Sequence, residues 1–271
     1  AAITGTEDNL VAIGQSYKAN EYNRINSENN GTINLSGNNY IGIYAQRAGQ
    51  TNTGALNLTG NNGIGMYTTA GTVNNSGNVN IGNSSVGIYA ETYPIPNDYT
   101  TSYAAFEVYN SGKITASSGE KAIGIYVNEN SSGGYYGQGT LYLQEGTDID
   151  VSASKGGVGV YSNKSYVMGT GLNKITAGEN GTGIYIKDNM VYLNNLELNL
   201  KGDNSVGIYT DGTSSFYGSG TVNVDGKGIV IFNVAGSGAF NQNFSVNSTS
   251  DSQYIVQNIK DRTIFYDSHA S

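Results

Sequence analysis

The chain has 271 residues, a formal net charge of −8, 39 glycines, two prolines and no cysteine. Charged residues make up only 13%, and no basic patch is present to neutralise phosphates, which excludes the usual nucleic-acid-binding proteins. No run of consecutive apolar residues is as long as the roughly 18 residues that a membrane-spanning helix needs. Residues 1–3 lack a basic or apolar leader, so we expect a removed signal peptide or a segment of a longer protein. Frequent glycine, with few strong helix formers, predicts many tight turns and almost no helix.

Residues 1–30 are predicted to be an irregular N-terminal segment. Within it, Val11-Ala12-Ile13-Gly14 can be aligned with the first clear motif of the chain, Ile41-Gly42-Ile43-Tyr44. We interpret residues 11–14 as a worn first coil and the polar residues 15–30 as loop.

The four-residue motif that ends at Tyr44 returns throughout residues 31–232. The last residues of its seven copies are Tyr44, Tyr67, Tyr89, Tyr126, Tyr161, Tyr185 and Tyr209. A degenerate eighth copy at 229–232 ends in Phe232. The intervals are 22 to 24 residues, apart from two of 37 and 35 residues. A fixed period in this range is typical of a solenoid.

A second segment of each repeat has apolar residues at alternate positions, as in Ile33-Asn34-Leu35 and in copies at 54–58, 77–81, 112–116, 146–151, 196–200 and 220–224. A period of two predicts strands with one buried face. Because each strand recurs only after a whole repeat, it should pair in parallel with its own copy. The chain is therefore predicted to be all-β, a right-handed parallel β-helix of roughly 8 to 10 coils with two loop insertions. We expect Ile41 and Ile43 to point inward, and Gly42 and Tyr44 outward.

The two long intervals predict insertions at about 90–111 and 127–145, which follow the same point of the repeat in consecutive coils. Long insertions in repeat proteins gather on a binding face, and tyrosine provides contact area with a polar tip. We predict one projecting, mildly acidic binding surface; the alternative is that the insertions cover the flank of the coil. Its candidate residues are Tyr93, Asp98, Tyr99, Tyr103, Tyr109, Glu129, Tyr135 and Tyr136.

The column of motif tyrosines has a structural interpretation and a functional one. Stacked identical rings stabilise neighbouring parallel strands without a ligand, which we expect to be their role. The alternative is that an exposed aromatic row grips an extended glycan.

An enzymatic function would need clustered carboxylates with basic residues. The best cluster is Glu145, Asp148, Asp150 and Lys155, and a solvated polar face explains it. His269 is the only histidine, which excludes histidine-based triads and multi-histidine metal sites. We therefore expect no catalytic residue, no metal and no cofactor.

Residues 233–271 are predicted to contain the last degenerate coils and a C-terminal tail. The apolar segments 244–246 and 254–256 are predicted to form one coil, and 263–266 the start of another.

The Gly-Ile-Tyr motif, the turns rich in Asn, Gly, Ser and Thr, and the lack of cysteine resemble the passenger regions of large type V autotransporter adhesins of Gram-negative bacteria, particularly of fusobacteria. The resemblance covers residues 31–232. It implies a β-helix on the bacterial surface, held by a C-terminal outer-membrane barrel outside this chain, and attachment to a glycan or protein receptor on host cells or other bacteria. We expect a monomer. A passive extracellular stalk and a carbohydrate-active β-helix enzyme are the alternatives.

Overall fold

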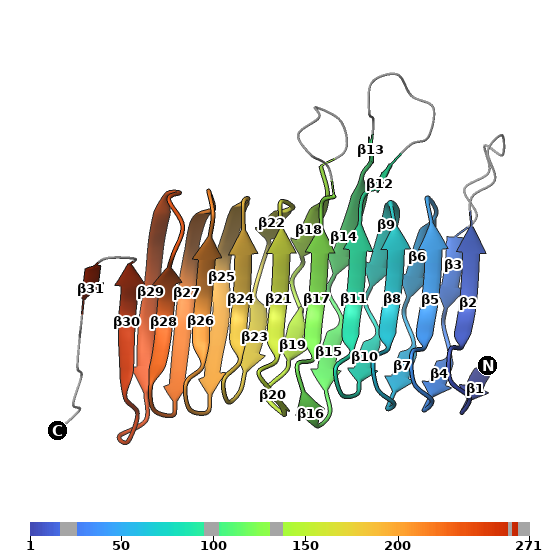
Figure 1. Cartoon of the computed structure of the whole chain (residues 1–271), viewed down its shortest axis with the longest axis horizontal. Helices are drawn as coiled ribbons and strands as arrows, with labels where there is room; N and C mark the ends of the chain where they lie inside the picture. The colour runs from blue at the N-terminus through green and yellow to red at the C-terminus, as the bar shows by residue number, and fades with distance from the viewer. Residues whose placement is uncertain (17–25, 95–102, 131–137, 260–261, 265–271) are drawn as a thin grey trace.

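The computed structural model describes residues 1–16, 26–94, 103–130, 138–259 and 262–264, and these residues form a right-handed parallel β-helix (Figure 1). The predicted fold class is confirmed. The described residues contain no helix, and hence none long and apolar enough to span a membrane. Each coil contributes strands to three rows, which we number in the order in which the chain passes through them after the Ile-Gly-Ile-Tyr motif.

The first row contains the motif strands. They pair in parallel in chain order, and the register places Tyr44 on Tyr67 and each later motif tyrosine on the next. The earlier alignment of Ile13 with Ile43 is also confirmed. The strands are β2 (Val11–Ser16), β5 (Ile41–Gln46), β8 (Ile64–Thr69), β11 (Val86–Glu91), β17 (Ile123–Asn128), β21 (Val158–Asn163), β24 (Thr182–Lys187), β26 (Val206–Asp211), β28 (Ile229–Val234) and β30 (Tyr254–Ile259).

The third row contains the strands predicted from alternating apolar residues. Ile33 and Leu35 are buried, while Thr32 and Asn34 lie on the outer face. The strands are β1 (Ala2–Gly5), β4 (Thr32–Leu35), β7 (Ala55–Leu58), β10 (Asn78–Ile81), β15 (Lys113–Ala116), β19 (Asp148–Asp150) and β23 (Asn173–Ala177).

The second row was not predicted, because its first strands are polar and lack an apolar alternation. It contains β3 (Asn26–Asn29), β6 (Gly49–Asn52), β9 (Gly71–Asn75), β14 (Phe106–Asn110), β18 (Thr140–Leu143) and β22 (Tyr166–Gly169). The interpretation of residues 15–30 as loop is wrong for 15–16, which belong to β2, and for 26–29, which pair with β6. Residues 2–5, in the segment predicted to be irregular, form the regular strand β1, which pairs with β4. In the last coils the second and third rows merge into the long strands β25 (Met190–Lys201), β27 (Ser215–Asp225) and β29 (Phe240–Ser248).

The buried face of the first row differs from the prediction at one residue. Ile43 and Ala45 are buried and Tyr44 lies on the outer face, but Gly42 also faces inward and Ile41 is half-buried on the outer face. A Cβ atom at Gly42 would lie 2.6 Å from the carbonyl oxygen of Gly65. Only glycine fits this inward position, and the alternation shifts by one residue there.

The same row corrects the interpretation of the degenerate copy at 229–232. Phe232 pairs with Ile208 and is only 1% exposed, so it is a core residue and does not replace a motif tyrosine. Asn233 takes the place above Tyr209 and accepts a hydrogen bond of 3.1 Å from Asn258. The tyrosine column therefore ends at Tyr209 in the described part of the chain.

The C-terminal coils confirm one prediction and correct another. Residues 244–246 and 254–256 lie in β29 and β30 and form a coil, as expected. β31 (Arg262–Ile264) pairs antiparallel with β30, so the chain turns back there instead of starting another parallel coil.

A buried ladder of asparagines fixes the corner between the second and third rows. Asn29 donates to Asn52 (2.8 Å), Asn52 to Asn75 (2.8 Å) and Asn75 to Asn110 (2.7 Å). Asn110 then donates to the carbonyl of Gly112 (3.1 Å). These amides satisfy one another inside the coil, which explains polar residues at inward positions.

Asn75→Ala is expected to lower the free energy of unfolding by about 2–4 kcal/mol, because it leaves the buried Nδ2 of Asn52 and Oδ1 of Asn110 without their partners. Asn57→Ala is a matched control, since Asn57 makes two similar bonds, to Asn34 (2.9 Å) and Asn80 (2.8 Å), on the solvated outer face. It should cost less than about 1 kcal/mol. Urea unfolding measures both; equal losses would contradict this description of the corner.

Candidate binding surface

The two insertions leave neighbouring coils at the same corner. β11 and β17 pair, with Glu91 opposite Asn128, and the chain re-enters the helix at β14 and β18, which also pair. The described bases of the two insertions lie at the upper edge of the molecule in Figure 1. The prediction that they share an edge is confirmed for the described residues at their bases.

Other coils show what the insertions replace. At this corner a single residue with positive φ turns the chain from the first to the second row, as in Arg47, Ala70, Lys164 and Asp188. In the two coils with insertions, Thr92 and Glu129 take this place, and their amides still bond to the next coil, to the carbonyls of Asn128 (3.2 Å) and Asn163 (3.0 Å). The regular hydrogen bonding therefore continues up to the first residue of each insertion.

Both insertions are shorter than the sequence predicted. Phe106 and Val108 are buried core residues of β14, and Leu141 and Leu143 are buried core residues of β18. The predicted bounds of 90–111 and 127–145 included these strands because the second row was not recognised.

The candidate residues lie in different parts of the structure. Tyr93 is half-buried in β12 (Tyr93–Pro94), which pairs antiparallel with β13 (Tyr103–Ala104). Glu129 is only 9% exposed. Its carboxylate is therefore not presented on the surface, and the prediction for this residue is wrong. Tyr109 lies on the outer face of β14 and not in a loop. The remaining candidates lie outside the described residues; they are Asp98, Tyr99, Tyr135 and Tyr136.

A column of four tyrosines and one methionine on the outer face of the second row, which we call the second-row ladder, was not predicted. Its members are in register in the structure. In the sequence, the intervals of 24 to 33 residues between successive members were the only sign of this column. Two ring pairs are stacked, Tyr109 on Tyr142 (4.7 Å, 6°) and Tyr192 on Tyr217 (5.0 Å, 11°). Tyr192 is 41% exposed and Met168 38%. The ladder consists of Tyr109, Tyr142, Met168, Tyr192 and Tyr217.

The first-row tyrosines form the predicted ladder. Their ring centroids are 4.6 to 5.3 Å apart and the rings are half-buried. Several pairs are nearly parallel, such as Tyr67 on Tyr89 (7°) and Tyr161 on Tyr185 (6°). Stacking covers the ring faces that a sugar would need, so the geometry favours the structural role over the glycan grip.

Carboxylates accept hydrogen bonds from the first-row tyrosines. Glu91 accepts hydrogen bonds from the hydroxyls of Tyr67 and Tyr89, and Asp211 from that of Tyr185 (3.1 Å). Burial, and then these carboxylates, raise the pKa of Tyr67, Tyr89 and Tyr185, and burial raises the pKa of Tyr126.

Alkaline pH is expected to destabilise the protein through these tyrosines. Their folded-state pKa values are raised, so the stabilisation is fully present below the unfolded pKa of about 10 and is lost as pH rises through the folded-state values. Urea unfolding between pH 8 and pH 11 should show constant stability up to about pH 10 and a fall above it. Tyr67→Phe with Tyr185→Phe should flatten that fall; an unchanged slope would contradict the assignment.

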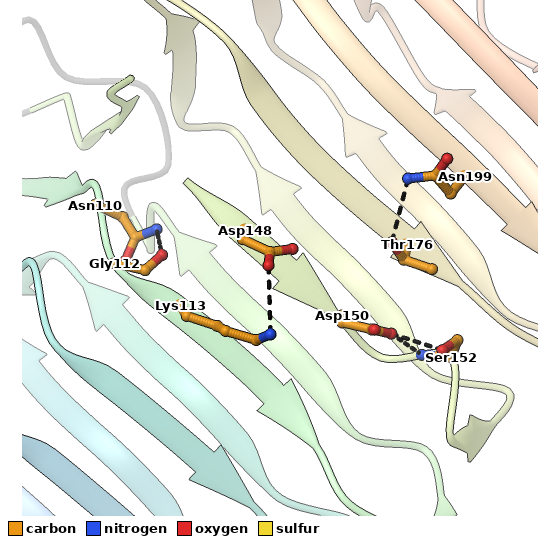
Figure 2. A network of polar contacts seen from close by, with 8 residues as sticks. All are labelled: Asn110, Gly112, Lys113, Asp148, Asp150, Ser152, Thr176 and Asn199. Atoms are coloured by element: carbon orange, nitrogen blue, oxygen red, sulfur yellow. Dashed lines mark hydrogen bonds and ion pairs between the residues drawn. The ribbon is translucent and has the colours of Figure 1, made fainter. Parts of the chain in front are cut away.

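Two members of the acidic cluster considered for catalysis, Asp148 and Asp150, are held in structural contacts (Figure 2). Asp148 pairs with Lys113 (3.4 Å), and Asp150 accepts from the amide (3.0 Å) and hydroxyl (2.6 Å) of Ser152. Asp148 lies within a column of alternating charge on the outer face, formed by Lys113, Asp148, Lys174 and Glu197.

The other members of the cluster lie at other places. Lys155 pairs with Glu179 (2.9 Å), and Glu145 lies against Gly171 at a different corner. In the described ranges, no three His, Asp or Glu side chains come close enough to hold a metal ion.

Comparison with known proteins gave no relative. No protein-family model, curated protein or solved structure matches this chain.

Proposed function

We propose that this chain is the rod-like part of a bacterial cell-surface adhesin, and that it attaches to host cells or other bacteria through the second-row ladder and the adjacent insertions. The observation that carries the proposal is the common position of these features. Tyr109 and Tyr142 lie in the first strands after the two insertions, so the ladder begins where the insertions return to the coil.

The chemistry of the ladder suits a protein receptor. Tyrosine and methionine are enriched at protein interfaces, and charged residues are depleted at their centres. The ladder has no charged member, and Tyr166 and Met190 lie beside it in the same strands. Because Tyr192 and Tyr217 are stacked, they present ring edges and hydroxyls rather than the open faces on which sugars stack.

Binding of the fluorescently labelled chain to host cells and to other bacteria tests the proposal. Tyr192→Ser with Tyr217→Ser should weaken binding by about tenfold or more, because the double variant removes two neighbouring aromatic contacts. Thr221→Ala with Ser245→Ala is a matched control in neighbouring coils, since it changes an exposed hydroxyl pair (3.3 Å) on the third row. Equal binding by the double tyrosine variant and the control would contradict a role for the ladder.

The contribution of the first insertion needs a narrow replacement. Exchanging residues 95–102 for a Gly/Ser segment of equal length keeps β12 and β13, whereas deleting 93–108 would remove the core residues Phe106 and Val108. The narrow replacement should reduce binding without lowering the melting temperature. Full binding after this replacement would leave the ladder alone as the proposed contact.

A passive stalk is the second candidate, and the uninterrupted stack favours it. Ten first-row strands pair without a gap in the described part of the chain, which makes a rod about 50 Å long at about 4.8 Å per coil. If the chain binds no cell type in the same assay, the stalk is the better description.

A further inference from the structure

The outer face of the first row is unusually apolar for a solvated sheet. A sheet with one face in water normally alternates apolar inward residues with polar outward ones. The third row follows this rule, with Thr32, Asn34, Asn57, Asn78 and Asn80 on its outer face. The first row instead presents two half-buried columns in register, one of Tyr44 to Tyr209 and one of Ile41, Ile64, Val86, Ile123, Val158, Thr182 and Val206.

The inward glycines are the cause of the second column. Because Gly42 and its equivalents face the core, the preceding residue, which is aliphatic in six of the seven copies and Thr182 in the other, is turned to the outside. The bordering column is mostly uncharged; it contains Gln46, Thr69, Glu91, Asn128, Asn163, Lys187 and Asp211.

We propose that this face binds the same face of a second copy of the chain. Strands of six residues at about 3.3 Å, in seven coils at about 4.8 Å, give a flat area of roughly 670 Å². That area is close to the roughly 800 Å² per partner of a standard stable interface. Two such sheets pack face to face, and a two-fold axis makes the contact self-complementary. The proposal departs from the monomer expected from the sequence.

Charge selects the orientation. Glu91 and Lys187 lie in the same column, three coils apart, with Asn128 and Asn163 between them. A two-fold axis along the strands, between β17 and β21, places Glu91 of each copy opposite Lys187 of the other. The two solenoids then run in opposite directions, and opposite charges meet twice at the border of the apolar contact.

Light scattering and sedimentation of the whole chain, from micromolar to hundreds of micromolar, test the proposal. The unchanged protein should form a concentration-dependent dimer. Ile123→Lys with Val158→Lys should give a monomer, because it buries unpaired charge at the centre of the contact. Asn80→Lys, on the exposed third-row face, is the matched control and should dimerise normally. An unchanged protein that stays monomeric, or a double variant that still dimerises, would overturn the proposal.

A milder variant keeps the test valid if the double variant fails to fold. Lys187→Glu changes a half-buried outer position and places a second carboxylate opposite Glu91 of the other copy. It should weaken the dimer by about tenfold, because like charges then meet at the border of the contact. Unaltered association would overturn the antiparallel orientation. The outcome is independent of cell binding, because the second-row ladder lies on another face.

Discussion

Ile208→Asn is expected to lower the free energy of unfolding by about 3–5 kcal/mol. Ile208 is fully buried in β26, so the change removes about 2 kcal/mol of apolar burial and places an amide without an assured partner in the core. Its neighbours in the column, Ile184 and Phe232, would both lose packing contacts.

Val206→Asn is the matched control for this prediction. Val206 lies two residues earlier on the same strand but is half-buried on the outer face. It should cost less than about 1 kcal/mol, since an outer amide stays hydrated. Urea unfolding of both variants measures the two losses in the free energy of unfolding. Similar losses would contradict the shift of the alternation at the intervening glycine.

Gly124→Ala is expected to cost about 2–4 kcal/mol although it adds only one methyl group. The new Cβ atom would lie 2.5 Å from the carbonyl oxygen of Gly159 and 2.5 Å from Cγ2 of Ile149. One obstacle is backbone of the next coil and the other is a core side chain, so relief requires movement of the stack.

Gly14→Ala, in the first coil, is the comparison. Its Cβ atom would meet only Cγ1 of Val11, at 3.4 Å, which is ordinary contact. The free energy of unfolding should change by less than about 0.5 kcal/mol. Thermal unfolding compares the two variants; a Gly124→Ala protein as stable as Gly14→Ala would show that the glycine column is not required by packing.

The repeat made most of the fold predictable. The intervals between Tyr44, Tyr67 and Tyr89 gave the coil length, and the alternation of Ile33 and Leu35 gave one strand and its buried face. Both signals arise because parallel stacking places each residue on its counterpart. The fold class, the tyrosine ladder and the shared edge of the insertions followed from that rule.

Three features were not predictable from apolar patterning. The second row was missed because Asn52 and Asn75 are buried amides that bond to each other, so their inward positions look polar. The outward position of Ile41 depends on the inward Gly42, which has no side chain to mark its direction. Phe232 was assigned to the tyrosine column because the motif shifts there by one residue without a change of spacing.

The sequence predicted where the candidate site lies better than it predicted which residues form it. The sequence placed both insertions at one corner, but it assigned Tyr109 to a loop and Glu129 to the surface. The second-row ladder was not recognised because Met168 interrupts its tyrosines and the second insertion lengthens the interval between Tyr109 and Tyr142. Its register emerged only once the second row was known.

The register of the first-row strands brings the bases of the two insertions together. The chain has no cysteine, so Glu91→Cys with Asn128→Cys gives a clean cross-linking pair in adjacent strands, one coil or about 4.8 Å apart. This pair should form a disulfide readily under mild oxidation. Glu91→Cys with Asn163→Cys, two coils or about 10 Å apart, should not, because a disulfide spans less than about 7 Å between Cα atoms. Cross-linking of the distant pair, or none of the adjacent pair, would contradict the stacked arrangement and the shared edge.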